Sequence, residues 1–470
     1  MKNLFTIFLP LLLLSSTVQA QDFENIAADI IKVQMSAVAW GDIDNDGDAD
    51  LFVCGSDSEN EVMSKLYENM GDDVFTEIDG FAVPGLSIGA AEWGDFNNDG
   101  FIDLLVQGYG DAGLTKIYIN NGDKTFTPIA QDFPPIYMGA VSWVDLNNDT
   151  YLDFALSGFR DESPWDYVSI LYKNNGDGTF SELSDVNLPG TMYGKIKWAD
   201  YDGDGYQDFI ITGYNSTYVT KIYKNNGDET FTESGISLHQ GWLGDVEWAD
   251  YNEDGNVDLV ISGTGGDGTE RFTIVYKNNG DGSFSETADV LPGVSHSSLE
   301  WADFDGDGDL DLYISGTPGD PGSGNYISSI YNNDNGNLVY QISFAPNYWG
   351  EAKACDYNND NYPDLVITGI DNFESIFSSI YKNTTSVFVE SVEMSSFRMI
   401  PIPANEVLHI CNNEIIQKIS IRDISGKEIA NYFPASKDVN ITTNTFTSGV
   451  YVVLLQTESK SHVEKLIIRH

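Results

Sequence analysis

An aspartate-rich loop recurs seven times along this chain, and that repeat limits what the chain can fold into. The copies begin at equivalent aspartates, spaced 50 to 55 residues apart: Asp42, Asp95, Asp145, Asp200, Asp250, Asp303 and Asp356. A period near fifty residues that contains several strand-like runs is typical of a β-propeller or a solenoid. The repeat therefore predicts an array of similar small sheets.

Each loop has the composition of a cation site. The copy from Asp303 to Asp311 places carboxylates at positions 1, 3, 5 and 9 and glycine at position 6. Calcium takes about six to eight oxygen ligands, and glycine makes the tight turn at little cost. An EF-hand needs glutamate at position 12 and flanking helices, but here position 12 is Ile314, inside a strand-like run. We expect a strand–loop–strand site that favours calcium over magnesium.

The residues around each loop follow one order. A short strand ends in Trp two residues before the loop in six copies, and Ala354 replaces it in the seventh. An apolar strand, a variable polar loop and a hairpin with an Asn-Gly turn follow. Each unit thus holds four short strands, which form one antiparallel blade. The tryptophans are expected to pack between blades: Trp40, Trp93, Trp143, Trp198, Trp248 and Trp301.

We therefore predict an all-β fold, a seven-bladed β-propeller of four-stranded blades with calcium loops, followed by a small C-terminal β-sandwich. A right-angled β-solenoid is the competing architecture, although its repeats are usually shorter. Residues 1–20 are predicted to be a signal peptide, 21–394 the propeller and 395–470 a separate domain. The chain is then secreted or held at the cell surface.

The net charge of the chain limits the kinds of partner that it can bind. The formal net charge is −50, and 66 of the 73 acidic residues precede residue 395. Such a surface repels nucleic acid and anionic membranes. No apolar run after the signal segment is long enough to span a bilayer. Three cysteines are too few for a disulfide scaffold; Cys54 and Cys355 are expected to be buried thiols, with a ring-closing disulfide as the alternative.

The repeated units, Trp-x-Asp-x-Asp/Asn-x-Asp-Gly-x-x-Asp before an apolar strand and glycine, resemble the FG-GAP/VCBS repeats of integrin-α-like propellers. The resemblance covers about residues 35–392 and implies up to seven calcium ions. It implies side-chain ligands at positions 1, 3, 5 and 9 and a carbonyl ligand at position 7. Thr150 and Asn361 replace the glycine of position 6 in loops 3 and 7.

The implied calcium ligands are listed here by loop. They are Asp42, Asp44, Asp46, Asp48 and Asp50; Asp95, Asn97, Asp99, Phe101 and Asp103; Asp145, Asn147, Asp149, Tyr151 and Asp153; Asp200, Asp202, Asp204, Tyr206 and Asp208; Asp250, Asn252, Asp254, Asn256 and Asp258; Asp303, Asp305, Asp307, Asp309 and Asp311; and Asp356, Asn358, Asp360, Tyr362 and Asp364.

Residues 395–470 resemble the C-terminal sorting domain of type IX secretion in Bacteroidota. The shared order is Pro-x-Pro-Ala, Leu-x-Ile, Asp-x-x-Gly-Lys and Gly-Val-Tyr, with Ile402 where asparagine is usual. The resemblance implies export by a signal peptide and then by type IX secretion, whose machinery is then a partner of this domain.

A ring of larger residues precedes the inner strands. Counting back from the loops, the equivalent residues are Met35, Ile88, Met138, Tyr193, Leu243, His296 and Trp349, with Tyr137, Trp242 and Tyr348 one residue earlier. In a propeller they surround one mouth of the channel, either as a plain hydrophobic rim or as a site where aromatic rings stack on a sugar or peptide. The candidate ligand-binding residues are Tyr137, Tyr193, Trp242, His296, Tyr348 and Trp349.

The sequence gives little support to catalysis. None of the five histidines lies in a triad or zinc spacing. We expect a monomeric, non-catalytic binding or adhesion module for an extracellular glycan or protein. The alternative is a polysaccharide-degrading lyase or hydrolase, because some similar calcium-rich propellers are polysaccharide lyases. Inner-strand charges line the same channel at one equivalent position: Glu92, Lys197, Glu247, Glu300 and Lys353.

Overall fold

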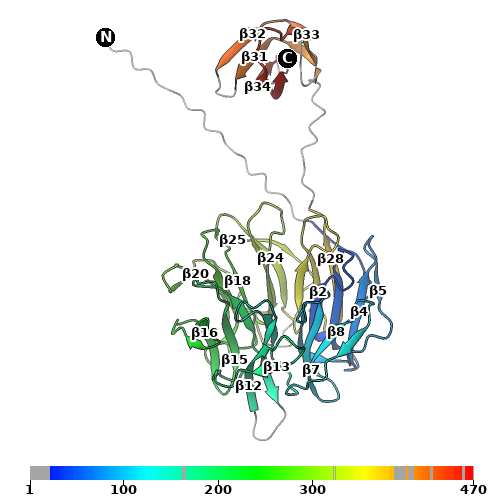
Figure 1. The fold of residues 1–470 in the computed structure, drawn as a ribbon, viewed down its shortest axis with the longest axis vertical. Helices are drawn as coiled ribbons and strands as arrows, with labels where there is room; N and C mark the ends of the chain where they lie inside the picture. The colour runs from blue at the N-terminus through cyan, green and yellow to red at the C-terminus, as the bar shows by residue number, and fades with distance from the viewer. Residues whose placement is uncertain are drawn as a thin grey trace, which may run out of the picture. The chain divides into compact units, whose positions relative to one another are not determined.

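A computed structural model describes residues 22–160, 166–320, 322, 324–385, 398–400, 407–423, 427–457 and 461–468. The chain divides into two compact units, residues 1–385 and 386–470 (Figure 1). Every regular element in these residues is a β-strand, and none of them forms a helix able to cross a membrane. The expected signal peptide lies outside the described residues.

The first unit contains seven four-stranded antiparallel sheets. Sheet 1 holds β2 (Gln34–Gly41), β3 (Asp50–Ser56), β4 (Val62–Asn69) and β5 (Phe75–Glu77). Sheet 2 holds β6 (Ser87–Gly94), β7 (Asp103–Tyr109), β8 (Gly113–Asn120) and β9 (Phe126–Pro128). Sheet 3 holds β10 (Val141–Val144), β11 (Asp153–Arg160), β12 (Asp166–Asn174) and β13 (Phe180–Glu182). Sheet 4 holds β14 (Ile196–Ala199), β15 (Asp208–Tyr214), β16 (Tyr218–Asn225) and β17 (Phe231–Glu233).

The remaining sheets keep the same strand order. Sheet 5 holds β18 (Val246–Ala249), β19 (Asp258–Gly265), β20 (Glu270–Asn278) and β21 (Phe284–Glu286). Sheet 6 holds β22 (Ser295–Ala302), β23 (Asp311–Thr317), β24 (Ile327–Asn333) and β25 (Leu338–Ser343). Sheet 7 holds β26 (Ala352–Cys355), β27 (Asp364–Ile370) and β28 (Ile376–Asn383), and its outer strand is β1 (Phe23–Asn25). The expected strand–loop–strand order is confirmed in every copy.

The outer strand of sheet 7 comes from the beginning of the described chain. In the sequence, both Phe23-Glu24 and residues 388–390 match the motif of an outer strand. Phe23 pairs with Asn383 in an antiparallel register, so β1 occupies that edge of β28. Residues 388–390 lie outside the described residues. Sheet 7 thus combines strands from the two ends of the first unit.

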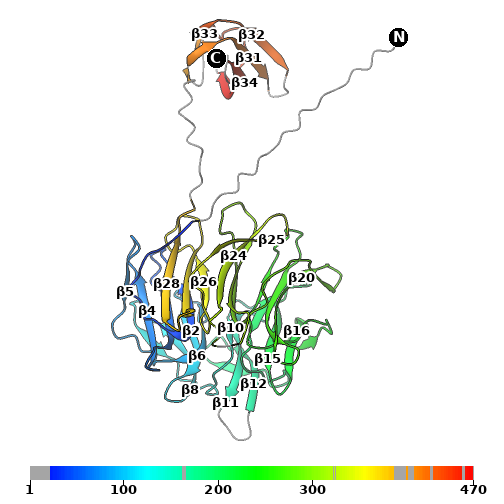
Figure 2. The same ribbon diagram turned by 180° about the vertical axis from the view of Figure 1, so that it is seen from behind.

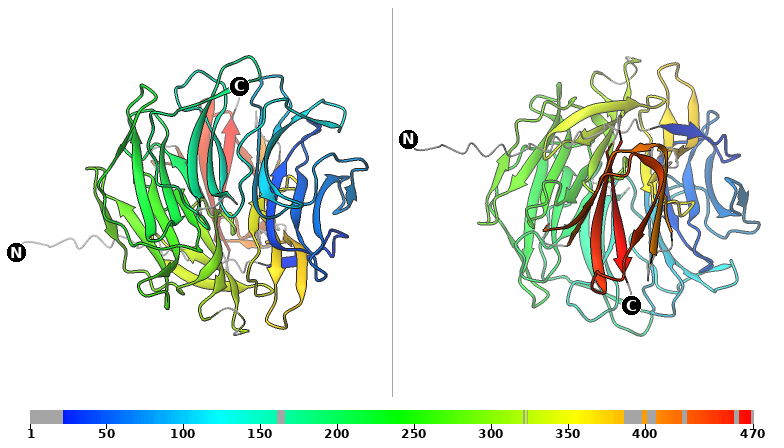
Figure 3. Two further views of the ribbon diagram at one scale, coloured as in Figure 1. Left: turned by 90° about the horizontal axis from the view of Figure 1, so that it is seen from below. Right: turned by 90° about the horizontal axis from the view of Figure 1, so that it is seen from above.

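The seven sheets contact their neighbours in a cycle. The innermost strands β2, β6, β10, β14, β18, β22 and β26 touch in that order, and β26 also touches β2. Figures 1 and 2 show these sheets side by side, and Figure 3 shows them arranged around a common axis. Strand 1 of each sheet lies nearest the axis, and strand 4 lies outermost.

Aromatic stacks fill the spaces between sheets. The indole of Trp143 stacks on Phe96 of the preceding sheet, with ring centroids 5.9 Å apart, and Trp301 stacks on Tyr251 at 5.6 Å. Sheet 7 lacks the tryptophan, and there Phe23 packs against Phe304 at 6.1 Å instead. The tryptophans therefore pack between sheets as expected, while Cys54 and Cys355 are free thiols.

A buried asparagine also links each sheet to the one before it. It is the last residue of the third strand, and its Nδ2 donates to the carbonyl of loop position 2 in the preceding sheet, at 2.6 to 2.8 Å. The bond from Asn69 to Tyr357 joins sheet 1 to sheet 7. The seven donors are Asn69, Asn120, Asn174, Asn225, Asn278, Asn333 and Asn383.

The second unit contains two small sheets. One holds β29 (Arg398–Ile400), β30 (Val407–Ile416) and β33 (Ser436–Thr442). The other holds β31 (Lys418–Asp423), β32 (Glu428–Tyr432), β34 (Gly449–Gln456) and β35 (Ser461–Ile468). Buried residues of both sheets, among them Leu408 and Ile421, belong to one apolar cluster.

Candidate functional site

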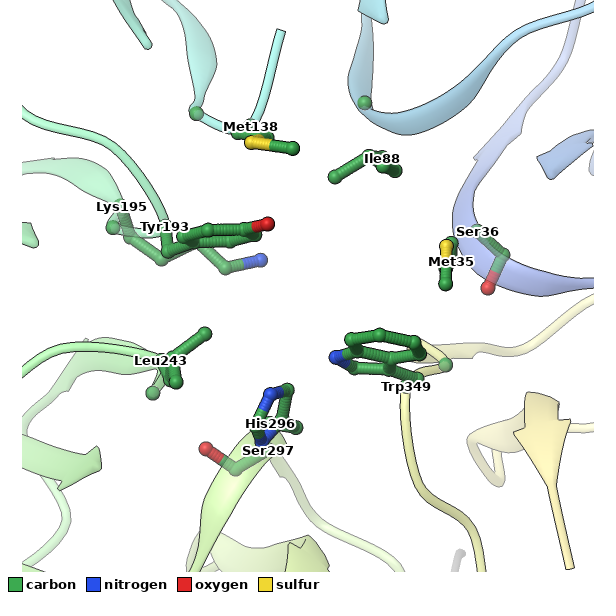
Figure 4. Close-up of a pocket in the computed structure, with 15 residues that line it drawn as sticks. Met35, Ser36, Ile88, Met138, Tyr193, Lys195, Leu243, His296, Ser297 and Trp349 are labelled. Atoms are coloured by element: carbon green, nitrogen blue, oxygen red, sulfur yellow. The ribbon is translucent and has the colours of Figure 1, made fainter. Parts of the chain in front are cut away.

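The seven residues that the repeat alignment places ahead of the inner strands line one pocket. We call them the collar: Met35, Ile88, Met138, Tyr193, Leu243, His296 and Trp349. Figure 4 shows their side chains directed towards the middle of the pocket, with Tyr193 and Trp349 on opposite sides. Each sheet contributes one collar residue, so the pocket lies on the axis shared by the sheets. Its volume is about 170 Å³.

All seven collar residues have left-handed backbone conformations, with φ between +48° and +59°. This conformation costs non-glycine residues about 1–2 kcal/mol each, and it is rare for a β-branched residue such as Ile88. Non-glycine residues in sparsely populated backbone regions tend to cluster at functional sites. Here the conformation turns seven large side chains inward at the same level.

Backbone hydrogen bonds between neighbouring sheets hold this conformation. The amide of Met138 donates to the carbonyl of Ile88 at 2.9 Å, and the amide of Leu243 donates to Tyr193 at 3.0 Å. The same bond joins His296 to Leu243, and at 2.6 Å it joins Met35 to Trp349. These hydrogen bonds therefore join collar residues of neighbouring sheets, including those of sheets 7 and 1.

A small residue follows every collar residue because the backbone of the second strand lies close behind it. A Cβ atom on Gly350 would lie 1.7 Å from the carbonyl oxygen of Thr368, and one on Gly194 would lie 1.9 Å from that of Thr212. Only glycine fits at this approach in sheets 2, 3, 4, 5 and 7, while Ser36 and Ser297 hold the position in sheets 1 and 6.

The predicted ligand-binding aromatic residues divide into two groups. Tyr193, His296 and Trp349 line the pocket. Tyr137 and Tyr348 are buried, with exposed fractions of 9% and 6%, and Trp242 is half-buried behind Tyr193. Tyr348 stacks on Trp349, with centroids 5.4 Å apart. This second group supports the collar instead of lining it.

Two layers of charge lie below the collar, because alternate residues of an inner strand face the same side. The upper layer, two residues after the collar, consists of Lys195, Asp245 and Glu351. The lower layer, four residues after the collar, consists of Glu92, Lys197, Glu247, Glu300 and Lys353. Sequence reasoning identified the lower layer but missed the upper one, whose members occur in only three repeats.

Most of these charges join neighbouring sheets. Lys197 pairs with Glu247 at 2.5 Å, and Lys353 pairs with Glu300. Glu92 instead accepts the amide of Trp143 in the next sheet, at 2.5 Å. Although burial disfavours the charged form of Lys353, the carboxylates around it raise its pKa well above the usual value. The lower layer is thus a half-buried network that spans several sheet boundaries.

The upper layer is less completely paired. The ammonium group of Lys195 lies 3.5 Å from Glu351 Oε1 and 3.8 Å from Asp245 Oδ1. Asp245 accepts the amides of Val246 and Leu299, at 2.9 and 3.0 Å. Glu351 Oε2 accepts one amide, and its other oxygen faces Lys195 only at the longer distance.

The aspartate loops lie at the other ends of the inner strands, and three of them gather carboxylates closely enough to hold a metal ion. Oxygen atoms from positions 1, 3 and 9 lie within 4.8 Å of one another in Asp42, Asp44 and Asp50, in Asp200, Asp202 and Asp208, and in Asp303, Asp305 and Asp311. Position 3 is asparagine in the other four loops. These oxygen-only donor sets fit a hard cation.

Hydrogen bonds from backbone amides to carboxylates fix the backbone conformation of each loop. Asp42 accepts the amides of Asp46 and Gly47, at 3.1 and 3.0 Å. The carboxylate of position 5 turns to the amide of position 7, as in Asp46 and Asp48 at 2.9 Å, and is not part of the close groups. Thr150 adopts φ +74° and still donates its amide to Asp145, so loop 3 keeps the glycine-type backbone.

The aspartate at position 9 connects the loop to the rest of the sheet. Asp208 is 0% exposed, and its Oδ1 accepts the amide of Asn225 at 2.7 Å, the same asparagine that bonds the preceding sheet. Burial raises the pKa of all seven position-9 aspartates, to about 7 in six loops and to about 8 at Asp311. A bound cation favours the ionised form of such an acid.

Lysine side chains already neutralise some loops. Lys224 contacts Asp202 and lies 2.9 Å from Asp204 in loop 4, and Lys124 lies 2.7 Å from Asp44 in loop 1. Loop 6, like loops 1 and 4, carries aspartate at positions 1, 3, 5 and 9.

Solved structures similar to this chain are distant. The α-L-arabinofuranosidase Arb93A of Fusarium graminearum is 13% identical and covers 62% of this chain and 91% of its own, with a TM-score of 0.39. The six-bladed lectin of Aleuria aurantia is 10% identical and covers 66% and 95%, also at 0.39. PorZ of Porphyromonas gingivalis, a surface component of the type IX secretion system, is 9% identical and covers 90% and 69%, at 0.24.

Comparison with curated proteins finds no match. Two protein families do match. The FG-GAP-like repeat matches residues 42–106, 95–156, 165–211, 200–261 and 250–314, which together make up more than half of the chain. The secretion system C-terminal sorting domain matches residues 398–469 and indicates secretion or surface exposure through the type IX machinery. The chain therefore belongs to the FG-GAP-like repeat family and carries a C-terminal sorting domain of type IX secretion.

Proposed function

We propose that this chain is a secreted, non-catalytic binding module whose ligand enters the collar. In this proposal the seven sheets are the blades of a closed seven-bladed propeller. The second unit is a small β-sandwich that directs export, and residues 1–20 are the signal peptide. The ligand is an extracellular glycan or protein, and Tyr193, His296 and Trp349 contact it.

One observation carries the proposal. Seven equivalent residues, one from each sheet, adopt a costly left-handed conformation and direct side chains into a single pocket. Packing alone does not require that all seven be large, because a small residue at this level would leave a plain channel. Aromatic rings with polar tips offer contact area and hydrogen bonding to a ligand.

Calcium is the proposed cofactor, held in up to seven loops by side-chain oxygens of positions 1, 3 and 9, which are all carboxylates in loops 1, 4 and 6 and include an asparagine at position 3 in the others. When bound, the ion supplies positive charge that neutralises closely spaced aspartates. Residues of the chain connect the loop to the neighbouring sheet. Position 9 fixes the asparagine of the third strand, and that asparagine bonds the preceding sheet. An ordered loop thus favours an ordered boundary between sheets, which keeps the collar assembled.

The test uses the secreted chain on an array of glycans and extracellular proteins, with calcium present. We expect binding that the double variant Tyr193→Ala and Trp349→Ala loses by at least about tenfold, because both faces of the pocket are removed. Phe373→Ala is the control, since this aromatic residue is 88% exposed and lies outside the pocket. Undiminished binding by the double variant, or release of reducing or unsaturated sugar by the wild-type chain, would contradict the proposal.

A further inference from the structure

The pocket changes character with depth. Its rim is apolar and aromatic, formed by the collar, and Lys195 is the one charged side chain that reaches both the pocket and the space below. The upper charged layer lies two residues further along the inner strands, a distance of about 7 Å for an extended chain. A ligand that enters the collar therefore meets methylene groups and rings first and charge second.

The charge below the rim favours a cation. In the upper layer two carboxylates, Asp245 and Glu351, surround one ammonium group, that of Lys195. Burial opposes ionisation of Asp245, but Lys195 and the other nearby lysines lower its pKa, so it remains a carboxylate. An anion would have to share Lys195 with both acids. Lys197 and Lys353 of the lower layer also act on Asp245, but across both layers five acidic side chains face these three lysines, so a further cation would complete the pairing instead.

The collar suits the stem of such a ligand. Trp349 and Tyr193 present rings on opposite sides of the pocket, where they offer apolar contact to a methylene stem. Met35, Met138 and Leu243 offer flexible apolar contact for methylene groups. Burial lowers the pKa of His296 to about 4, so its imidazole is neutral at physiological pH and does not repel a cation.

The polar partners within reach are also incompletely used. Glu351 Oε2 accepts the amide of Val38 at 2.9 Å, while Oε1 has Lys195 at 3.5 Å. An ammonium group carries three donors and needs several acceptors when it leaves water. Glu351 lines the space below the collar, two residues further along the inner strand than Trp349, a depth of about 7 Å that a four-carbon stem spans from the collar.

We propose that the collar receives an extended cationic side chain, a lysine presented by an extracellular protein partner, with its stem between Tyr193 and Trp349 and its ammonium group on Glu351. This assignment rests on the proposed binding function and names its ligand class. The net charge of −50 gives long-range attraction for a basic partner and disfavours acidic ones.

The test measures binding of the peptide acetyl-Gly-Gly-Lys-Gly-Gly-amide to the full chain in calcium, by isothermal titration. The matched peptide carries norleucine, which has the stem without the charge. We expect at least about tenfold weaker binding of the norleucine peptide, and a similar loss for Glu351→Gln, which keeps an oxygen for the amide of Val38. Glu77→Gln on the outer strand β5 is the control and should bind as wild type does.

A second variant covers the case in which Glu351→Gln fails to fold. Leu243→Lys places a tethered ammonium group in the collar and should exclude the lysine peptide by at least about tenfold. Cadaverine carries the same chemistry without a peptide, and binding of cadaverine more tightly than the peptide would overturn the assignment to a protein partner. Equal affinities of the lysine and norleucine peptides would overturn the assignment to a cation.

The outcomes also separate this inference from the proposed function. A glycan that binds the wild-type chain and is lost with the Tyr193 and Trp349 double variant, while the lysine peptide does not bind, overturns the inference and leaves the binding module intact. If no ligand of any class depends on those two residues, both fail.

Discussion

At the scale of single residues, the titration of His296, which lines the pocket, makes the stability of the folded chain depend on pH. Burial lowers the pKa of its imidazole to about 4, with a smaller effect from Arg271. The unfolded chain, with an ordinary pKa of about 6.5, then binds more protons than the folded chain between about pH 4 and 6.5. The contribution of this residue to stability is therefore complete above pH 6.5 and is lost as the pH falls through that window.

We predict that the free energy of unfolding of the wild-type chain, measured relative to that of His296→Leu, falls between pH 7 and pH 5. Using the difference cancels the titration of the many aspartates. Side-chain NMR of the five histidines provides a direct check, and one of them should titrate below pH 5. A pKa near 6.5 for His296, or identical pH dependence of both chains, would contradict the buried neutral imidazole.

Asn225 represents the buried asparagines that join neighbouring sheets. It is 0% exposed, and its Nδ2 donates to Leu146 at 2.8 Å. Asn225→Ala should lower the free energy of unfolding by about 2 kcal/mol, because it leaves buried carbonyl oxygens without donors. Asn226→Ala is the matched control, since its exposed amide bonds Thr230 in the same turn, and it should change stability by less than about 0.5 kcal/mol. Equal effects in urea unfolding would argue against a link between sheets.

Single residues also show which features of the collar could be predicted from the sequence and which could not. Counting back from the loops identifies the seven collar residues, because the repeat has a constant length between collar and loop. The same count does not reveal the left-handed conformation of Ile88, since backbone angles depend on bonds from the neighbouring sheet. Nor does it separate Trp349 from Tyr348, which differ by one position and therefore point to different sides.

At the scale of the elements, the loops differ in how much cation binding they allow. Positions 1, 3 and 9 offer three carboxylates in loops 1, 4 and 6, as the sequence indicates, but the structure adds lysines that compete for the first two. Those lysines come from hairpins, so no local motif in the loop reveals them.

Lys224→Met should therefore raise the calcium affinity of loop 4 by about fivefold, since removing a neighbouring positive charge is worth about 1 kcal/mol near the surface. Lys221→Met on the same strand is the control, because Lys221 pairs with Glu233 outside the loop. Calcium titration by calorimetry at low salt measures the change. If both variants bind calcium like the wild type, Lys224 does not compete for the loop.

The loops are also coupled to one another. Asn45 donates its side-chain amide to the carbonyl of Gly100 in the next loop at 2.8 Å, and Asn359 donates to Gly47 at 3.0 Å. Asn98 and Asn148 make the same bond, whereas Glu253 occupies this position in loop 5. This pattern joins loops 7, 1, 2, 3 and 4 in a continuous series. Ordering one of them by a cation favours the ordered form of the next.

At the scale of the whole molecule, the described chain forms two compact units, each with its own sheets. The sequence predicted the change near residue 395 from charge and strand pattern. What it left undecided was the outer strand of the last sheet, because two segments carry the same motif and only spatial proximity distinguishes them.

We predict that residues 21–394, made with another secretion signal, fold without the second unit and melt at the same temperature as the corresponding transition of the full chain. The first unit has apolar clusters of its own between its sheets, which supports this expectation. Differential scanning calorimetry of both chains measures it. A truncated chain that fails to fold would show that the boundary is misplaced.

The central claim is that calcium in the repeat loops holds the ring of sheets together around the collar. Its most direct test is the melting temperature of the full chain in saturating calcium and in excess chelator. A cation that binds only the folded state stabilises it in proportion to the logarithm of its concentration. We predict a melting temperature that rises with calcium across the titration, and a melting curve unchanged by excess chelator would contradict the account.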